Sequence, residues 1–345
     1  MITILRWILL PFSLIYHVII WVRNLLYDFQ IFKSKSFDIP TIVIGNLAIG
    51  GTGKSPMTEY LIRLLKDEYK IATLSRGYGR KTKGFRLVEL SSQAIEVGDE
   101  PLQFKKKFPE ITVAVNEDRC AGIEKLQEYH DVIILDDAFQ HRKLKPGYSI
   151  LLFDFQSLYQ PIILLPTGNF RDIFSSTKRA DLIIITKCPE IISENKKAHI
   201  EHLIRKHNTA PIFYTRIGYD KPLNILGKTY AEELTDKYIV LCCGIANPTP
   251  LVDYLETKGN KVQLVQFPDH HNYTAGDYEK IKAIFNQIEF PNKLIITTEK
   301  DLQRIDKESF IDYPLLYIPI HLQTADKQQL TFDHFIKNYI SKNLN

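Results

Sequence analysis

The sequence has few cysteines, little net charge and no internal repeat or low-complexity tract, and these absences narrow its function. Its 345 residues include four cysteines, Cys120, Cys188, Cys242 and Cys243, and none forms a C-x-x-C pair. This argues against a disulfide framework or a zinc knuckle and favours a reducing compartment. A net charge of +4 suits anionic ligands or an acidic membrane surface. It is too weak and dispersed to indicate nucleic acid, so we expect no nucleic-acid partner.

Within the first 37 residues, polar residues are scarce between Arg6 and Arg23. Sixteen mostly apolar residues separate Arg6 from Arg23, and both tryptophans of the chain, Trp7 and Trp21, lie among them. No small-residue cleavage site follows this run, so a secretory signal is not indicated. The run is shorter than the ~20 residues that a clean membrane span needs, and it contains Pro11, which would kink a helix.

On a helical projection the polar residues of this segment share one face. They are Thr3, Arg6, Ser13, His17, Asn24 and Asp28. The tryptophans border that face, where amphipathic rings favour a water–lipid boundary. We therefore expect residues 1–37 to form a membrane-associating helix that lies in the interface of one leaflet. A full span and a core helix with one wet face are the alternatives.

Beyond residue 38, short apolar runs alternate with helical patterns, which predicts strands and helices in turn. The predicted strands are "TIVIG", "KIATLSR", "ITVAV", "DVIILDD", "SILLFDF", "LIIITK", "PIFYTR", "YIVLCCGIANP", "KVQLVQF", "NKLIITTEKD" and "PLLYIPI". This alternation indicates an α/β fold with a mostly parallel sheet covered by helices. We expect a P-loop core over 38–218. A second, smaller α/β lobe is expected over 219–345, including a linker and the C-terminal helix.

A phosphate-binding loop is indicated by "GNLAIGGTGKSP", although Ala48 occupies the position where the usual pattern G-x-x-x-x-G-K-[ST] opens with glycine. A strand precedes the loop and a helical pattern follows it, as such a loop requires. The loop residues expected to bind nucleotide are Gly50, Gly51, Thr52, Gly53, Lys54 and Ser55. A glycine-rich turn with an accidental Lys-Ser is the alternative.

A magnesium site is predicted beside this loop. Asp136 and Asp137 follow the apolar strand "VIIL", and one such carboxylate usually holds the Mg²⁺ of a P-loop enzyme. The Ser55 hydroxyl is the expected third ligand. The stretch "TKCP" lacks the aspartate that would read guanine, so we expect ATP as the nucleotide.

Nine motifs in order make the chain resemble the tetraacyldisaccharide 4′-kinases, the lipid A 4′-kinases of Gram-negative bacteria. They are "GNLAIGGTGKSP", "SRGYGR", "GDEP", "DDAFQHR", "LPTGNFRD", "ITKCP", "CGIANP", "FPDHHNY" and "TTEKD". Ala138 stands where the family more often has glycine, Ser55 replaces the commoner threonine, and the family's loop does not need glycine at position 48. The resemblance implies transfer of the ATP γ-phosphoryl group to the 4′-hydroxyl of a tetraacylated glucosamine disaccharide 1-phosphate.

The resemblance also implies roles for single residues. Asp99 would be the catalytic base, assisted by His270, and Lys54 would contact the β- and γ-phosphates. The residues alone favour a helix cap for Asp99, and they are compatible with His270 as a polar loop residue. The candidates for substrate contact are Arg76, Tyr78, Arg119 and Arg171.

A membrane-switch P-loop ATPase, of the partition or septum-positioning type, is the rival function. Such proteins carry a lysine early in the loop, where this sequence has Ile49. Lipid-dependent phosphate transfer would separate the two. For the kinase, a four-chain lipid substrate stays in its bilayer, so we expect a peripheral or monotopic enzyme on the cytoplasmic face of the bacterial inner membrane.

Overall fold

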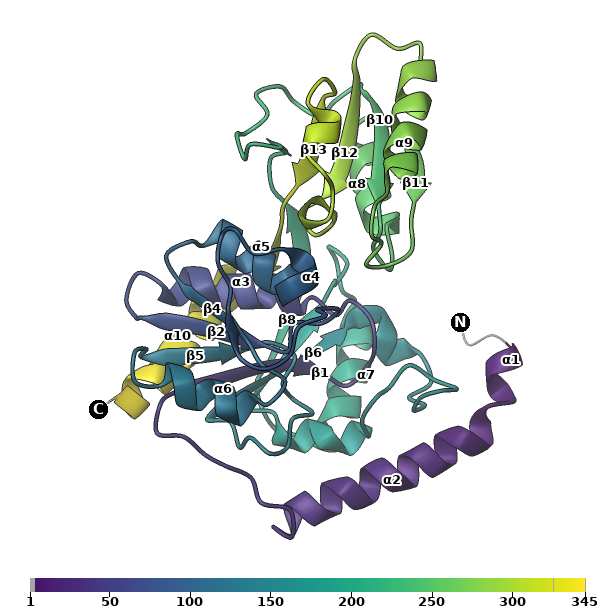
Figure 1. Cartoon of the computed structure of the whole chain (residues 1–345). Coiled ribbons are helices and arrows are strands. Elements are labelled where there is room, and N and C mark those ends of the chain that lie inside the picture. Colours follow the sequence, from purple (N-terminus) through teal and green to yellow (C-terminus); the bar gives the residue numbers. More distant parts are fainter. Residues whose placement is uncertain (1–3, 325, 345) are drawn as a thin grey trace. The chain divides into compact units, whose positions relative to one another are not determined.

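The computed structural model describes residues 4–324 and 326–344, which form two compact units. The first unit runs to Ile217 and resumes at Leu322, and the second is Gly218–His321. Each unit is an α/β structure with its own sheet (Figure 1). The expected fold class, P-loop NTPase-like with a mostly parallel sheet and a second α/β lobe, is confirmed.

The first sheet has the strand order β14-β8-β7-β6-β1-β5-β2-β4-β3. Its strands are β1 (Thr41–Asn46), β2 (Ile71–Ser75), β3 (Arg86–Leu87), β4 (Thr112–Val115), β5 (Val132–Leu135), β6 (Tyr148–Asp154), β7 (Leu182–Thr186), β8 (Ile212–Tyr219) and β14 (Ile320–Thr324). From β8 to β4 neighbouring strands run parallel, and β3 adds an antiparallel edge. The P-loop strand β1 is therefore central, with its carboxyl end beside those of β5 and β6.

Helices cover both faces of this sheet. They are α3 (Lys54–Leu65), α4 (Ala94–Val97), α5 (Asp99–Lys107), α6 (Arg119–Leu126), α7 (Glu194–Arg205) and α10 (Asp326–Leu344), with short 3-10 turns at Phe155–Tyr159 and Phe174–Arg179. Successive strand residues point to opposite faces, so Ile42 and Ile44 pack with α3, α5 and α10, whereas Val43 packs with α6 and α7. Both faces are buried, which explains the continuous apolar runs in the sequence.

The C-terminal helix belongs to the first unit. We expected it in the second lobe, but Phe332, Ile336 and Ile340 of α10 lie buried in the core on the α3 side of the first sheet. The chain returns through β14, which pairs beside β8. We assigned α10 to the second lobe because it follows that lobe in the sequence. Its apolar face, however, is buried in the first unit.

The second unit is a five-stranded sheet in the order β11-β10-β12-β13-β9. Its elements are β9 (Leu223–Asn224), β10 (Tyr238–Cys243), α8 (Thr249–Thr257), β11 (Lys261–Gln266), α9 (Ala275–Gln287), β12 (Lys293–Thr298), β13 (Leu315–Ile318) and 3-10 turns at Asp301–Gln303 and Glu308–Phe310. All pairs are parallel except β13 with β9.

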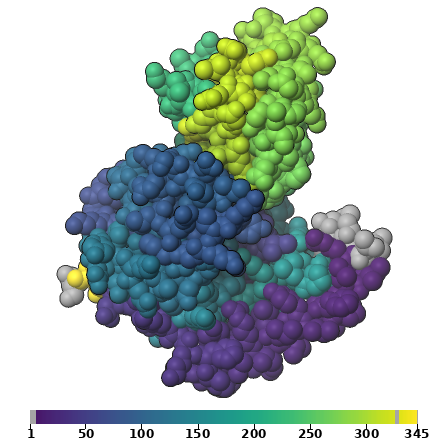
Figure 2. Space-filling view, in the orientation of Figure 1, coloured from purple at the N-terminus to yellow at the C-terminus, as the bar shows by residue number. Residues whose placement is uncertain are grey.

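The N-terminal segment forms a short helix, α1 (Ile4–Trp7), and a long one, α2 (Leu10–Asp28), on the surface of the first unit (Figure 2). Pro11 lies in the first turn of α2, where the absence of its N–H costs nothing, so the expected kink is instead a break between two helices. Of the polar face, Thr3 lies outside the described residues. By length and composition α2 is able to cross a bilayer.

The polar face of α2 lies against the protein, and its apolar face is exposed. Ser13 and Asn24 are buried, and Asp28 pairs with Arg142 at 2.8 Å and with Lys178 at 2.9 Å. The exposed side chains are apolar, including Phe12, Leu14, Ile15, Val18, Ile19, Trp21 and Val22. The alternative of a core helix with one wet face is therefore wrong, because this helix presents its apolar side outward. Two of the polar residues, His17 and Asp28, are exposed, although Asp28 is held by its ion pairs.

Candidate nucleotide and phosphoryl-transfer site

The predicted phosphate loop connects β1 to α3 at the carboxyl edge of the first sheet. Lys54 opens α3, and Gly53 is its N-cap residue in a left-handed conformation with φ 82°. The α3 amino end therefore meets this loop, an arrangement that binds anions because free backbone N–H groups and the helix dipole converge there. The hydroxyl of Thr186, at the end of β7, donates to the Thr52 carbonyl at 2.9 Å and so helps to fix the loop.

The absent glycine at position 48 has a structural reason. Ala48 forms an isolated antiparallel bridge with Phe170, and its side chain is buried. Left-handed backbone occurs in this loop at Gly50, with φ 102°, and at Gly53. The loop thus has glycine where positive φ requires it, and an extended residue at position 48 accepts a side chain.

Lys54 faces an acidic residue beyond β5. Its Nζ lies 3.9 Å from Oδ1 of Asp137, which also accepts hydrogen bonds from both terminal nitrogens of Arg171. Burial by itself raises the pKa of Asp137, but the charges of Lys54 and Arg171 hold it below the usual range. Asp137 is therefore ionised and already paired with two cations.

Asp136 is in a different environment from its neighbour. It is fully buried and accepts a hydrogen bond from the Thr58 hydroxyl at 3.4 Å. Burial, followed by the negative charge of Glu100, raises the pKa of Asp136 to about 7. Glu100 in turn accepts from the Ser55 hydroxyl at 3.1 Å. Ser55, Asp136 and Glu100 thus bring together oxygen atoms that could serve as metal ligands at the start of α3.

These oxygen atoms suit magnesium, which prefers oxygen ligands such as carboxylates and hydroxyls. Two carboxyl groups that repel each other beside a hydroxyl are stabilised by a divalent cation between them. Glu100 was missed from the sequence, because it is one acidic residue in the first turn of a helix, where such residues are common. Its position directly after Asp99 in "GDEP" was the available signal.

The raised pKa of Asp136 predicts a pH-dependent stability in metal-free protein. Between an unfolded pKa near 3.8 and a folded pKa of about 7, the folded state binds more protons, so stability falls as pH rises through this window. Asp136→Asn removes this effect. We expect the variant to gain on the order of 1 kcal/mol or more over the parent at pH 8 and much less at pH 5, measured by thermal unfolding in EDTA.

A control aspartate lies at the amino ends of the strands, on the opposite side of the same sheet from the site. Asp131 precedes β5 and accepts from the Lys70 backbone N–H at 2.7 Å. Asp131→Asn should show no comparable gain at pH 8. An equal change for Asp136→Asn at both pH values would contradict the assignment of a destabilising buried carboxylate.

The predicted base and two predicted substrate residues lie on neighbouring segments. Asp99 is the first residue of α5 and is buried. The N-cap residue is Gly98, so Asp99 is not the cap that the alternative interpretation required. A Cβ on Gly98 would lie 3.0 Å from the Tyr78 carbonyl oxygen, which shows how closely the "SRGYGR" loop packs on this turn. Arg76 and Tyr78 are exposed on that loop.

Arg119 and Arg171 hold the loops of the site together. Arg119, the first residue of α6, is buried and donates to the carbonyls of Glu117 at 3.0 Å and Asp137 at 3.3 Å. Burial lowers the pKa of Arg119, and the charge of Asp137 opposes that shift. Arg171 donates to Asn46 as well as to Asp137. Contact of either arginine with substrate stays a prediction.

His270 belongs to the second unit. It has a left-handed φ of 59°, a strained value for histidine, and its Nε2 lies 3.2 Å from Nζ of Lys300. The neighbouring Asp269 has its Oδ1 4.0 Å from the His270 ring nitrogen Nε2 and closer to Nζ of Lys300, at 3.2 Å. The strained backbone is typical of functional positions, and the pairing of His270 with Asp99 stays a prediction.

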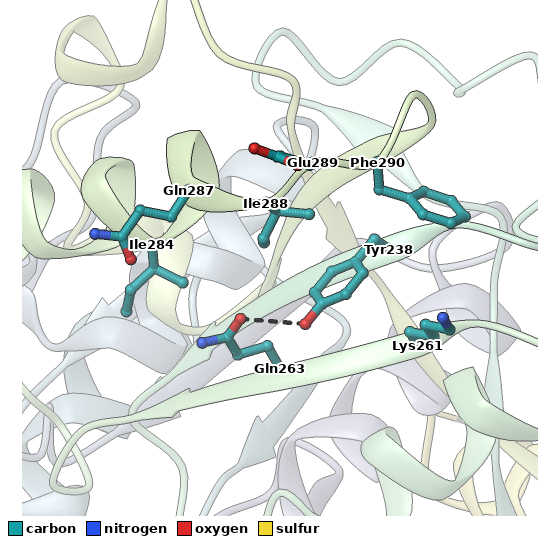
Figure 3. A pocket seen from close by; sticks show the side chains of 8 residues that line it. All are labelled: Tyr238, Lys261, Gln263, Ile284, Gln287, Ile288, Glu289 and Phe290. Carbon is teal, nitrogen blue, oxygen red and sulfur yellow. Dashed lines mark hydrogen bonds between the residues drawn. The ribbon is translucent and has the colours of Figure 1, made fainter.

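The second unit also has an open pocket of about 370 Å³, shown in Figure 3. Tyr238 and Lys261, which begin β10 and β11, line it together with the end of α9. Ligands of α/β sheets bind at the carboxyl ends of the strands, and this pocket is at the opposite ends. None of its lining residues is a predicted site residue, so it adds nothing to the site.

Comparisons with known proteins agree with the motifs. A family model described as tetraacyldisaccharide-1-P 4′-kinase matches residues 5–340. A tetraacyldisaccharide 4′-kinase of Flavobacterium johnsoniae is 44% identical, with 99% of each chain covered. That of Phocaeicola vulgatus is 42% identical over 99% of this chain and 97% of its own.

A solved structure gives the same result. The crystal structure of LpxK from Aquifex aeolicus in complex with ATP is similar, with a TM-score of 0.76 and 29% identity. The match covers 99% of this chain and 100% of the other. With the family model matched over nearly the whole sequence, the chain belongs to the tetraacyldisaccharide-1-P 4′-kinase family.

Proposed function

We propose that this chain transfers the γ-phosphoryl group of ATP to the 4′-hydroxyl of a tetraacyldisaccharide 1-phosphate, a step of lipid A biosynthesis. The observation that carries this proposal is the gathering of Lys54, Ser55, Glu100 and the Asp136–Asp137 pair at one edge of the sheet. Family membership favours this kinase activity over the membrane-switch ATPase.

Phosphoryl transfer needs positioning and neutralisation of charge more than covalent help from the protein. The loop amides and the start of α3 would hold the ATP phosphates, and Lys54 would move from Asp137 to the β- and γ-phosphates. Mg²⁺, held by Ser55, Asp136 and Glu100, would neutralise the phosphate charge. Asp137 is the weaker ligand candidate, because Lys54 and Arg171 already pair with it.

Asp99 would accept the proton of the attacking hydroxyl. It adjoins Glu100, whose carboxylate contacts Ser55 of the loop, so the base would lie beside the phosphates. The neighbouring loop with Arg76 and Tyr78 would contact the sugar or its 1-phosphate, with Arg119 and Arg171 as further candidates. By the family resemblance, His270 would assist Asp99.

The exposed apolar face of α2 supports work at a membrane. One acyl chain of about a dozen carbons holds its lipid in a bilayer by roughly 10 kcal/mol, at ~0.8 kcal/mol per CH₂. A four-chain acceptor therefore stays in the membrane and the enzyme must reach it there. We place the protein on the cytoplasmic face, where ATP is available, with α2 lying in the interface.

The test uses purified protein in detergent micelles with Mg-ATP and tetraacyldisaccharide 1-phosphate, and it measures the mass of the lipid. A gain of one phosphoryl group supports the kinase. Unmodified lipid with steady ATP hydrolysis would refute it and favour the membrane switch.

Replacing two apolar side chains of α2 should weaken membrane binding. Ile15 and Ile19 are 59% and 57% exposed, one turn apart. Burying an isoleucine in lipid is worth about 1.5–3 kcal/mol, so Ile15→Ser/Ile19→Ser should lower affinity for anionic phospholipid vesicles at least tenfold in a sedimentation assay.

Ile191→Ser provides the matched control, because Ile191 is 85% exposed on the same unit but outside α2. It should bind vesicles as the parent does. Binding of the double variant within twofold of the parent would contradict the assignment of this face.

A further inference from the structure

The polar face of α2 is a docking surface for the segment 164–172, which contains the "LPTGNFRD" motif. Ser13 and Thr167 exchange hydrogen bonds: the Ser13 hydroxyl donates to Oγ1 of Thr167 at 2.9 Å, and the Thr167 N–H donates back at 3.0 Å. Asn24 donates to Oδ1 of Asp172 at 2.9 Å. Thr167 and Asp172 are almost fully buried, so these contacts are made away from water. Leaving such groups without partners is costly.

The same segment is hydrogen-bonded to the first half of the phosphate loop. The Arg171 N–H donates to the Leu47 carbonyl at 2.8 Å, and the Ile49 N–H donates to the Asn169 carbonyl at 2.8 Å. These bonds flank the bridge at Ala48 and connect three successive loop residues to segment 164–172. The loop conformation thus depends on the position of segment 164–172.

Side chains reinforce this connection at Arg171. The Tyr16 hydroxyl of α2 donates to the Arg171 carbonyl at 3.0 Å, and the Arg171 guanidinium binds Asn46 and Asp137. Asn46 in turn donates to Oγ1 of Thr52 at 2.8 Å inside the loop. A continuous series of contacts therefore runs from α2 through Arg171 to the phosphate loop and to the aspartate that faces Lys54.

We propose that α2 positions the nucleotide site as well as binding the membrane, with Ser13, Tyr16 and Asn24 as positioning residues. The two faces of the helix divide these tasks, because its polar side orders segment 164–172 and its apolar side meets lipid. Undocking of α2 would release that segment, loosen the loop amides and lower the affinity for ATP. This inference rests on the nucleotide site of the proposed function but not on the identity of the acceptor.

The experiment measures binding of a fluorescent ATP analogue with Mg²⁺ in detergent, without any lipid acceptor. Ser13→Ala/Asn24→Ala should lower the affinity about tenfold or more while vesicle binding changes less than twofold. Tyr16→Phe removes one hydroxyl and should lower nucleotide affinity about two- to fivefold. Ile15→Ser/Ile19→Ser should show the reverse, with weaker vesicle binding and unchanged nucleotide affinity.

Thermal unfolding and circular dichroism check that the variants are folded. Should the double variant not fold, Tyr16→Phe still decides, since losing one hydroxyl leaves the packing in place. Nucleotide affinities within twofold of the parent for the folded polar-face variants would overturn the proposal. Equal loss of nucleotide affinity in the exposed-face variant would also overturn it. Failure to phosphorylate the lipid would leave this pattern of nucleotide affinities unaffected, so the two proposals fail separately.

Discussion

Lys54→Ala is expected to lower kcat for lipid phosphorylation by at least about 10³-fold. The ammonium group neutralises charge on the phosphates during transfer, and removing one such group in comparable sites costs 10²–10⁵-fold. The structure adds a second reason: Asp137 loses one of its two cationic partners, the one at 3.9 Å, so its negative charge is less well balanced beside the phosphates. The lipid mass assay with saturating ATP measures the loss.

Lys66→Ala is the matched control for this variant. Lys66 is the C-cap residue of the same helix and pairs with Glu110 at 2.7 Å near the surface. Its removal should change kcat less than twofold. Activity of Lys54→Ala above a tenth of the parent value would exclude Lys54 from the phosphate site.

Asp99→Asn is expected to lower kcat by about 10²–10⁴-fold with little change in KM for ATP. A general base contributes this much, and the amide cannot accept the proton of the hydroxyl. Because Gly98 is the N-cap of α5, the substitution leaves the cap unchanged and should alter thermal stability only slightly. Steady-state kinetics with the lipid mass assay measures kcat and KM for the parent and the variant.

Asp131→Asn separates loss of a base from loss of a negative charge on the protein. It should retain the parental kcat, because Asp131 lies at the amino ends of the strands, away from the site. A parental kcat for Asp99→Asn would show that Asp99 is not the base and acts only in the first turn of α5. A loss of kcat that is accompanied by a lower melting temperature would indicate a structural role.

The sheet and the loop were predictable because their signals are local. Continuous apolar runs mark strands that are buried on both faces, and the order strand, glycine-rich loop, helix marks the phosphate site. Asp136 and Asp137 were found in the same way, since they directly follow a buried strand. Each of these features depends on a few consecutive residues.

The features that escaped prediction depend on contacts between distant residues. The bridge of Ala48 with Phe170 and the contact of Ser55 with Glu100 join segments that no spacing connects. Ser13 and Asn24 were correctly placed on one face of α2, whereas His17 is exposed. The pattern also did not show that Thr167 and Asp172 would provide hydrogen-bond partners for that face. Amphipathic periodicity identifies two sides of a helix without saying which one meets water.

The return of α10 to the first unit has a consequence for biosynthesis. The second unit is inserted between β8 and β14, so the ribosome must produce all of it before the last helix of the first unit emerges. Until then the face that receives Phe332, Ile336 and Ile340 is exposed. The nucleotide-binding unit therefore completes its core last although its phosphate loop is made early, and a nascent chain arrested before residue 326 would be a target for chaperones and proteases.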